Sequence, residues 1–176
     1  MISTCAVTTM SSGMTAAISN LEKTSSATCT TTHSEREMTN THQLAYVSFS
    51  VAGDSLHPEF WTEYFGVAPD FSVTKGQRFK TPSGRLSSVP GRTGVWGIRS
   101  KIAVCSDLLE PHLRYLVRHL NLPRADLRQL LADKGAHMRF FCYWDNKAGD
   151  RAPDVPIDIR VMMEAMGGTV EIDEYR

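Results

Sequence analysis

The sequence has no surplus of charge of either sign and no long apolar run. It carries 19 Lys and Arg against 19 Asp and Glu, so the formal net charge is zero. Without net charge there is no bulk attraction to nucleic acid or to an anionic membrane, and such a partner must be recognised by a local patch. No stretch approaches the roughly 18 consecutive apolar residues of a membrane-spanning helix. These absences favour a globular protein without membrane association.

Cysteine is also scarce, with four residues and no C-x-x-C pair. Four widely spaced cysteines are too few for a disulfide-stapled scaffold in a chain of this length, so we expect reduced thiols. The first ten residues contain no basic residue and no apolar run of roughly 7 to 15 residues, so they do not resemble a secretory signal. The sequence therefore predicts a cytoplasmic protein.

Catalytic motifs are missing as well: there is no Gly-rich phosphate loop, no G-x-S-x-G and no H-E-x-x-H. Cys142 and His137 lie five residues apart, on opposite faces of a predicted strand, so core packing is the preferred interpretation of the thiol. His112 and His119 have no third ligand at metal spacing, and we interpret them as a surface pair. The sequence predicts no catalytic residue, metal ligand or cofactor; an enzyme of unrecognised class stays as a lesser alternative.

Two regions of different composition divide the chain. Residues 1–43 are rich in Ser and Thr and contain no Phe, Trp or Tyr. Such a segment cannot bury enough apolar surface to offset the entropy lost on ordering, so it predicts a disordered tail. Residues 44–176 are long enough to form a hydrophobic core, and we expect them to be one globular domain.

Hydrophobic periodicity in the second region predicts the element order βαββααβαβ. The strands are expected at 45–51, 71–75, 95–101, 137–144 and 169–175, and the helices at 58–65, 107–120, 123–134 and 156–166. Asp107 followed by Glu110 resembles a capping box for the longest helix. Helices on one face of a mostly antiparallel sheet of about five strands make an α+β two-layer sandwich, whose first part can follow a ferredoxin-like path.

A series of short motifs in this order resembles a known family. The motifs are Gly53-Asp54, an aromatic helix, Gly66-Val-Ala-Pro69, Lys75-Gly76, a strand with Trp96, a leucine helix and Asp173-Glu-Tyr175. Together they resemble the bacterial family known as domain of unknown function 4279, over about residues 44 to 176. The resemblance implies a small bacterial α+β domain and supplies no catalytic residues.

The most informative local feature is a segregation of charge. No acidic residue lies between Asp70 and Asp107, a segment that contains seven Lys and Arg residues. Phe79 and Trp96 are interleaved with them. An acidic protein surface or a small anion suits such a patch, and so does nucleic acid, because bases stack on aromatic rings while cations contact phosphates. The candidate binding residues are Lys75, Arg78, Lys80, Arg92, Trp96 and Arg99.

The leading hypothesis is a non-enzymatic bacterial interaction module that binds an acidic surface of another protein through the basic loop between residues 75 and 101. Small immunity proteins of toxin systems offer a fold-level analogy. An anion- or RNA-binding module is the alternative, although Phe140–Trp144 lacks the glycines of an RNA-recognition motif. A third interpretation is a solvated loop whose charges pair with acidic residues near the C-terminus, namely Asp154, Asp158, Glu164, Glu171, Asp173 and Glu174.

Overall fold

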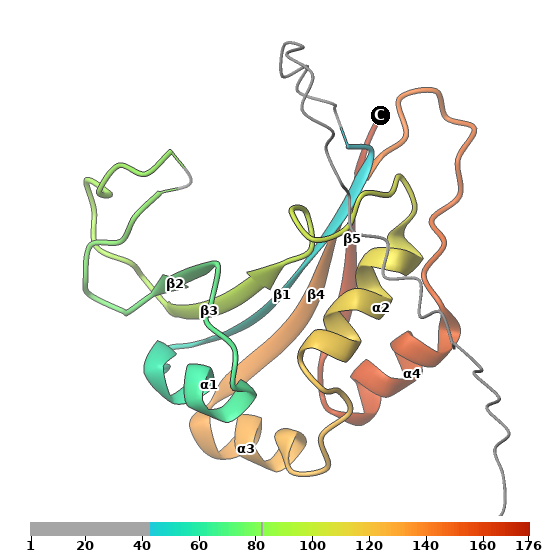
Figure 1. Ribbon diagram of the computed structural model, residues 1–176. Helices are drawn as coiled ribbons and strands as arrows, with labels where there is room; N and C mark the ends of the chain where they lie inside the picture. The colour runs from blue at the N-terminus through green and yellow to red at the C-terminus, as the bar shows by residue number, and fades with distance from the viewer. Residues whose placement is uncertain (1–42, 82) are drawn as a thin grey trace, which may run out of the picture. The chain divides into compact units, whose positions relative to one another are not determined.

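The computed structural model describes residues 43–81 and 83–176 (Figure 1). The predicted disordered tail, apart from Gln43, lies outside the described residues. Within the described ranges the chain forms five strands and four helices in the predicted order. They are β1 (Ala45–Gly53), α1 (Pro58–Phe65), β2 (Phe71–Val73), β3 (Gly94–Arg99), α2 (Leu109–His119), α3 (Leu127–Lys134), β4 (Ala136–Asp145), α4 (Ile157–Ala165) and β5 (Thr169–Tyr175).

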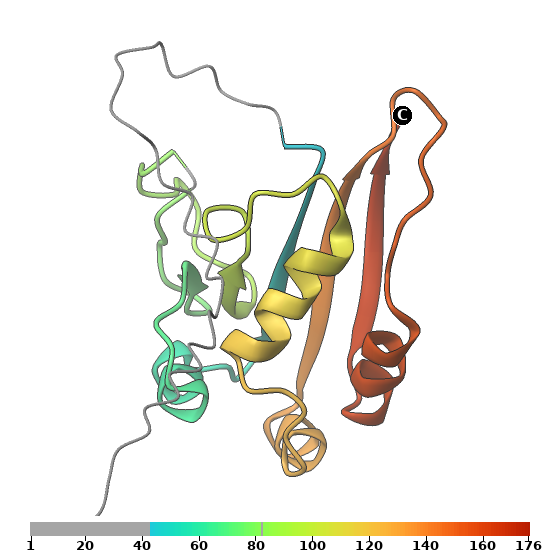
Figure 2. The same ribbon diagram turned by 45° about the vertical axis from the view of Figure 1, so that its right-hand side comes forward.

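The strands form one five-stranded sheet in the order β2-β3-β1-β4-β5. β1 and β2 both run antiparallel to β3, and β4 runs antiparallel to β1, so two split β-α-β units interleave as in the ferredoxin-like path. β5 then joins β4 in parallel through α4. The four helices lie on one side of the sheet (Figures 1 and 2). The predicted α+β two-layer sandwich is thereby confirmed.

Strand alternation separates an inner face, which packs on the helices, from an open face. Val47, Phe49 and Val51 of β1 point inward and are completely buried, and so are Phe140 and Cys142 of β4. The buried leucines of α2 and its C-cap recur at helical spacing and are Leu109, Leu113, Leu116 and Leu120. Each buried apolar side chain stabilises the fold by roughly 1.5 to 3 kcal/mol before the entropy of ordering is counted. The core therefore lies between the inner face and the helices.

The N-terminus of α2 is capped from a distant part of the chain, not by the predicted capping box. Asp154 accepts hydrogen bonds from the backbone N–H groups of Leu109 (2.8 Å) and Glu110 (3.0 Å). Asp107 instead accepts a hydrogen bond from the N–H of Leu44 at 3.0 Å. Because Asp107 is used to hold the start of β1, α2 begins two residues later than predicted.

The start of α3 also differs from the prediction. The helix begins at Leu127, not at Pro123. Arg124 lies in the preceding turn and donates hydrogen bonds to the carbonyl oxygens of Tyr64 (2.6 Å) and Leu120 (3.2 Å). These contacts hold the turn against the end of α1, which fixes the helix start in a way that local sequence does not reveal.

His112 was predicted on the surface and is in fact completely buried. Its Nε2 lies 3.0 Å from the carbonyl oxygen of Ser106 and therefore donates to it, while Nδ1 lies 2.8 Å from Ser100 Oγ, whose single proton is shared with the carbonyl oxygen of Val47 at 2.9 Å. Ser100 Oγ also accepts from the N–H of Val47 at 2.9 Å. Desolvation lowers the pKa of His112. The neutral ring thus ties α2 to β1 and to the chain that follows β3.

Candidate functional site

The basic residues lie in the connection between β2 and β3, which is itself folded. Residues 74–81 and 83–93 protrude from one edge of the sheet (Figure 1), and we call them the basic extension. The chain doubles back on itself through hydrogen bonds from the N–H of Ser87 to the carbonyl of Phe79 (2.8 Å) and from the N–H of Gly91 to that of Gln77 (2.9 Å). The predicted polar loop is therefore a hydrogen-bonded element that can hold its charges in place.

Two glycines let the extension and its neighbouring strand lie close to the open face. A Cβ atom at Gly91 would come within 2.3 Å of Cγ1 of Val73, so only glycine permits this arm of the extension to lie on β2. A Cβ atom at Gly97 would come within 2.2 Å of Cζ of Phe71, because the phenyl ring rests directly on β3. Phe71 and Val73 therefore both face the open side of the sheet.

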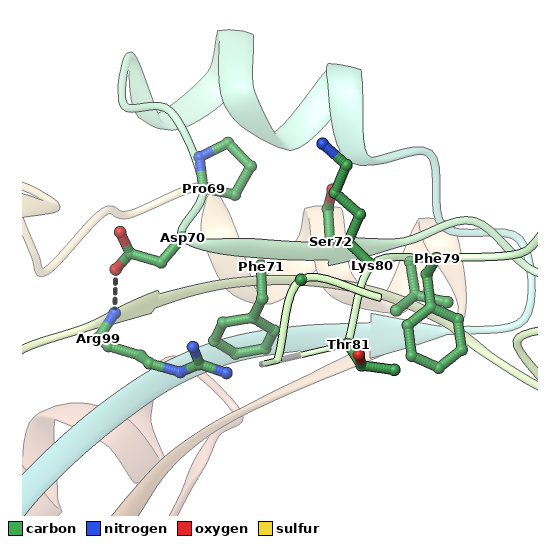
Figure 3. A pocket seen from close by; sticks show the side chains of 10 residues that line it. Pro69, Asp70, Phe71, Ser72, Phe79, Lys80, Thr81 and Arg99 are labelled. Carbon is green, nitrogen blue, oxygen red and sulfur yellow. Dashed lines mark hydrogen bonds between the residues drawn. The ribbon is translucent and has the colours of Figure 1, made fainter. Parts of the chain in front are cut away.

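A cleft of about 520 Å³ lies between the basic extension and the open face (Figure 3). The guanidinium carbon of Arg99 is 4.6 Å from the centre of the Phe71 ring, a cation–π arrangement. Oδ2 of Asp70 accepts a hydrogen bond from the backbone N–H of Arg99 at 2.6 Å. The lining residues are Pro69, Asp70, Phe71, Ser72, Val73, Phe79, Lys80, Thr81, Gly84 and Arg99.

The structure keeps five of the six predicted site residues at the surface. Arg99 lines the cleft, and Lys80 lines it with its side chain directed away from the two phenyl rings (Figure 3). Arg78 and Arg92 are exposed on the extension. Lys75 is exposed too, and its Nζ pairs with Oδ2 of Asp54 at 2.9 Å. These residues therefore surround the same edge of the sheet.

Trp96 does not belong to this surface, which corrects the prediction. Strand alternation places it on the inner face, where it is completely buried. Its ring stacks on Phe65 with centroids 4.9 Å apart, and its Nε1 donates a hydrogen bond to Oγ1 of Thr62 at 3.0 Å. Trp96 lies between basic residues in the sequence but belongs to the core, because adjacent residues of a strand point to opposite faces of the sheet.

The acidic residues near the C-terminus do not neutralise the basic extension within the described chain. Three of them, Asp158, Glu171 and Glu174, pair with Arg114, Arg139 and Arg176 respectively. β5 lies at the opposite edge of the sheet from β2, so its acidic residues are three strands away from β3. Among the described residues the extension's only ion pair is that of Lys75, and the positive patch persists in the folded protein.

The open face also carries a ladder of stacked tyrosine rings, which lies outside the six predicted site residues. Tyr46 and Tyr143 stack with ring centroids 4.7 Å apart and an interplanar angle of 11°, and Tyr175 lies 4.7 Å beyond Tyr143. Nζ of Lys101 lies over the Tyr46 ring, 5.1 Å from its centroid. The sequence does carry a signal for this ladder. Phe141 and Tyr143 alternate with inward residues of β4, so their rings face outward.

The thiol of Cys142 and the grouping of potential metal ligands bear on covalent and metal chemistry in the described part of the chain. Burial raises the pKa of the Cys142 thiol to about 12, so it is not a thiolate nucleophile at neutral pH. No cluster of three or more His, Cys, Asp or Glu side chains in residues 43–81 and 83–176 has metal-binding geometry. None of the helices in these ranges has the length and apolar character needed to cross a membrane. What the site offers is a charged surface beside an aromatic cleft.

Comparison with known proteins identifies the family. The family model described as "Domain of unknown function (DUF4279)" matches residues 41–176. The chain belongs to this family. The match spans every strand and helix of this DUF4279 domain as well as the basic extension, and it bears out the resemblance of the sequence motifs. Neither a curated protein nor a solved structure matches the chain.

Proposed function

We propose that this DUF4279 domain is a non-enzymatic interaction module, which binds an acidic surface of another protein in the bacterial cytoplasm through its basic extension. One observation carries the proposal. Arg78, Lys80, Arg85 and Arg92 are exposed on a folded element and form no ion pair with any described residue. Cations held in a fixed arrangement without internal partners suit an external anionic surface, which they attract and orient.

Apolar residues on the same element favour a protein as the partner. Leu86 is 61% exposed and Val89 is 64% exposed, although both lie on the hydrogen-bonded extension. A protein interface combines an apolar centre with a charged rim. A nucleic-acid backbone offers phosphates to the basic residues but no apolar surface to Leu86 and Val89. A surface that combines basic and apolar residues therefore matches a protein better than a nucleic-acid backbone.

An anion- or RNA-binding module is the alternative, and the aromatic rings of the open face are its support. RNA-binding sheets use exposed ring faces on which bases stack. Here Lys101 and Tyr143 both contact the ring of Tyr46, while Arg99 covers a face of Phe71 and Arg139 covers one of Phe141. Ring faces already occupied by cations or other rings leave little area for bases, which favours the protein partner.

The test is capture of a partner by the tagged full chain from a bacterial lysate, with and without nuclease. The variant reverses three charges on the extension: Arg78→Glu, Arg85→Glu and Arg92→Glu. The matched control reverses three exposed charges elsewhere: Arg118→Glu, Lys134→Glu and Arg176→Glu. We expect a nuclease-resistant, stoichiometric protein that is lost with the extension variant and retained by the control. Retention that disappears with nuclease supports RNA and contradicts the proposal.

A further inference from the structure

We infer that the cleft between the basic extension and the open face binds a group with an apolar body and a single carboxylate. This inference rests on the proposed function, because such a group is what an acidic, partly apolar segment of a partner protein would insert there. The same chemistry occurs in a free small carboxylate, so the experiment below separates the two sources. The cleft residues that carry the inference are Asp70, Phe71, Phe79 and Arg99.

The apolar half of the cleft is formed by two phenyl rings. Phe71 and Phe79 are both half-buried and lie on the same side of β2 (Figure 3). Pro69 and Val73 add further apolar surface to the lining. The volume of about 520 Å³ falls within the range of small-ligand sites. One apolar side chain, or an apolar ligand of similar size, can enter between the extension and the strand.

The charged half of the cleft is the Arg99 guanidinium. It stacks on Phe71, and among the described residues no carboxylate forms an ion pair with it. A planar guanidinium held by an aromatic ring keeps its N–H fork available for a carboxylate in bidentate geometry. Arg99 is therefore preorganised for an anion that arrives with the apolar group.

The charge balance of the lining selects a single carboxylate. Arg99 presents its guanidinium to the Phe71 ring, whereas the Lys80 side chain is directed away from the rings (Figure 3), and Asp70 is the anionic member of the lining. Asp70 is fixed beside the site by its 2.6 Å hydrogen bond to the backbone of Arg99. It repels a second negative charge, so a phosphate monoester with a charge of about −2 is a poorer match than a carboxylate with a charge of −1.

The probes for the test share one aromatic group and differ in charge and size. They are the blocked peptide acetyl-Ser-Glu-Phe-Ser-amide, its counterpart acetyl-Ser-Lys-Phe-Ser-amide, free 3-phenylpropanoate and uncharged 3-phenylpropanamide. Each is titrated into the isotope-labelled full chain while backbone amide resonances are followed. We expect the two carboxylate probes to shift the amides of Gly84, Gly97 and Arg99, and the lysine peptide and the amide to leave them in place.

Two variants test the two halves of the cleft separately. Arg99→Gln is expected to weaken the binding of both carboxylate probes at least tenfold. Arg139→Gln is the matched control, since Arg139 also stacks on a phenyl ring of the open face, 5.3 Å from the centre of Phe141, and it should leave binding unchanged. Gly97→Ala displaces the Phe71 ring without a change of charge and should also weaken binding.

The outcomes discriminate between the sources and between the proposals. Tighter binding of the acidic peptide supports a protein segment as the source, and equal or tighter binding of 3-phenylpropanoate supports a free carboxylate. Absence of shifts at millimolar probe, or equal binding to wild type and Arg99→Gln, overturns the inference. If Arg99→Gln retains the captured partner while the triple extension variant loses it, the partner protein is excluded as the source of the carboxylate and the proposed function stands. If the probes bind as expected but the triple variant retains the partner, the proposed function fails instead.

Discussion

The two faces of the sheet are built from the same strands but use aromatic residues in different ways. On the inner face Phe49 packs edge-on against Phe65, Trp96 and Phe140, with ring centroids 5.4 to 6.4 Å apart. On the open face Phe71 lies beneath the guanidinium of Arg99. Rings buried among rings exclude water and stabilise the fold, whereas the partly exposed rings of the open face contact cations and one another. The comparison teaches that strand alternation separates a buried aromatic core from a surface whose rings contact cations.

The largest effect expected from this separation concerns two residues of β3. Trp96→Ala should lower the free energy of unfolding by about 3 to 5 kcal/mol, because it removes a completely buried indole and its stacking on Phe65. Arg99→Gln, on the other face, should change it by less than about 0.5 kcal/mol. Urea unfolding followed by circular dichroism measures both variants. Similar losses for the two would contradict the separation.

A smaller effect is expected at the cap of α2, which belongs to the helical layer. Asp154→Ala should cost about 1 to 2 kcal/mol, because it leaves the N–H groups of Leu109 and Glu110 without their acceptor. Asp107→Ala serves as the comparison, since local sequence predicted that residue as the cap, and it should cost less. The same unfolding experiment applies. A larger loss for Asp107→Ala would show that the capping assignment is wrong.

The buried histidine should make the inner layer sensitive to acid. Because burial lowers the pKa of His112 in the folded state, the unfolded chain takes up the proton first as the pH falls below about 6.5. The contribution of the neutral ring is therefore fully present above that pH and declines as the pH falls through the interval down to the lowered pKa. Unfolding free energies measured from about pH 8 down to about pH 5 should show this decline.

The control for this dependence is His119→Gln, a substitution on the exposed end of the same helix. It should leave the slope of unfolding free energy against pH unchanged, whereas His112→Gln should flatten it. A steep slope that persists in His112→Gln would assign the acid sensitivity to another group.

The smallest effect is expected at the tyrosine ladder of the open face. Tyr143→Leu removes two ring contacts but keeps an apolar side chain, so the loss should be about 0.5 to 1 kcal/mol. A double-mutant cycle with Tyr46→Leu isolates the stacking energy from the loss of area. If the coupling energy between Tyr46 and Tyr143 exceeded the unfolding free energy lost in Trp96→Ala, the open face would contribute more to stability than the inner face, contrary to this prediction.

The fold followed from the sequence because its strands and helices have strong periodicity. Val47, Phe49 and Val51 alternate with polar neighbours, and the leucines of α2 recur at helical spacing, so element type and order were predictable. The helix starts were not predictable, since Asp154 and Arg124 act through contacts with residues that are distant in sequence. A local capping pattern cannot anticipate an acceptor supplied by another loop.

The candidate site was predictable in its charges but not in its shape. The absence of acidic residues between Asp70 and Asp107 located the positive patch in the sequence. Trp96 was misplaced because interleaving in sequence does not say which face of a strand a side chain occupies. The cleft beside Arg99 depends on Gly91 and Gly97, whose missing Cβ atoms allow the extension and Phe71 to approach the sheet. Such packing is a property of the folded chain.

The central claim is that the basic extension binds an acidic protein while the inner layer supplies stability. The most direct test measures both properties on one variant, Arg78→Glu with Arg85→Glu and Arg92→Glu. The account predicts that its midpoint of thermal unfolding stays within about 2 °C of wild type, since these exposed residues make no ion pair with described residues, and that the captured partner is lost. Retention of the partner by this folded variant would contradict the account.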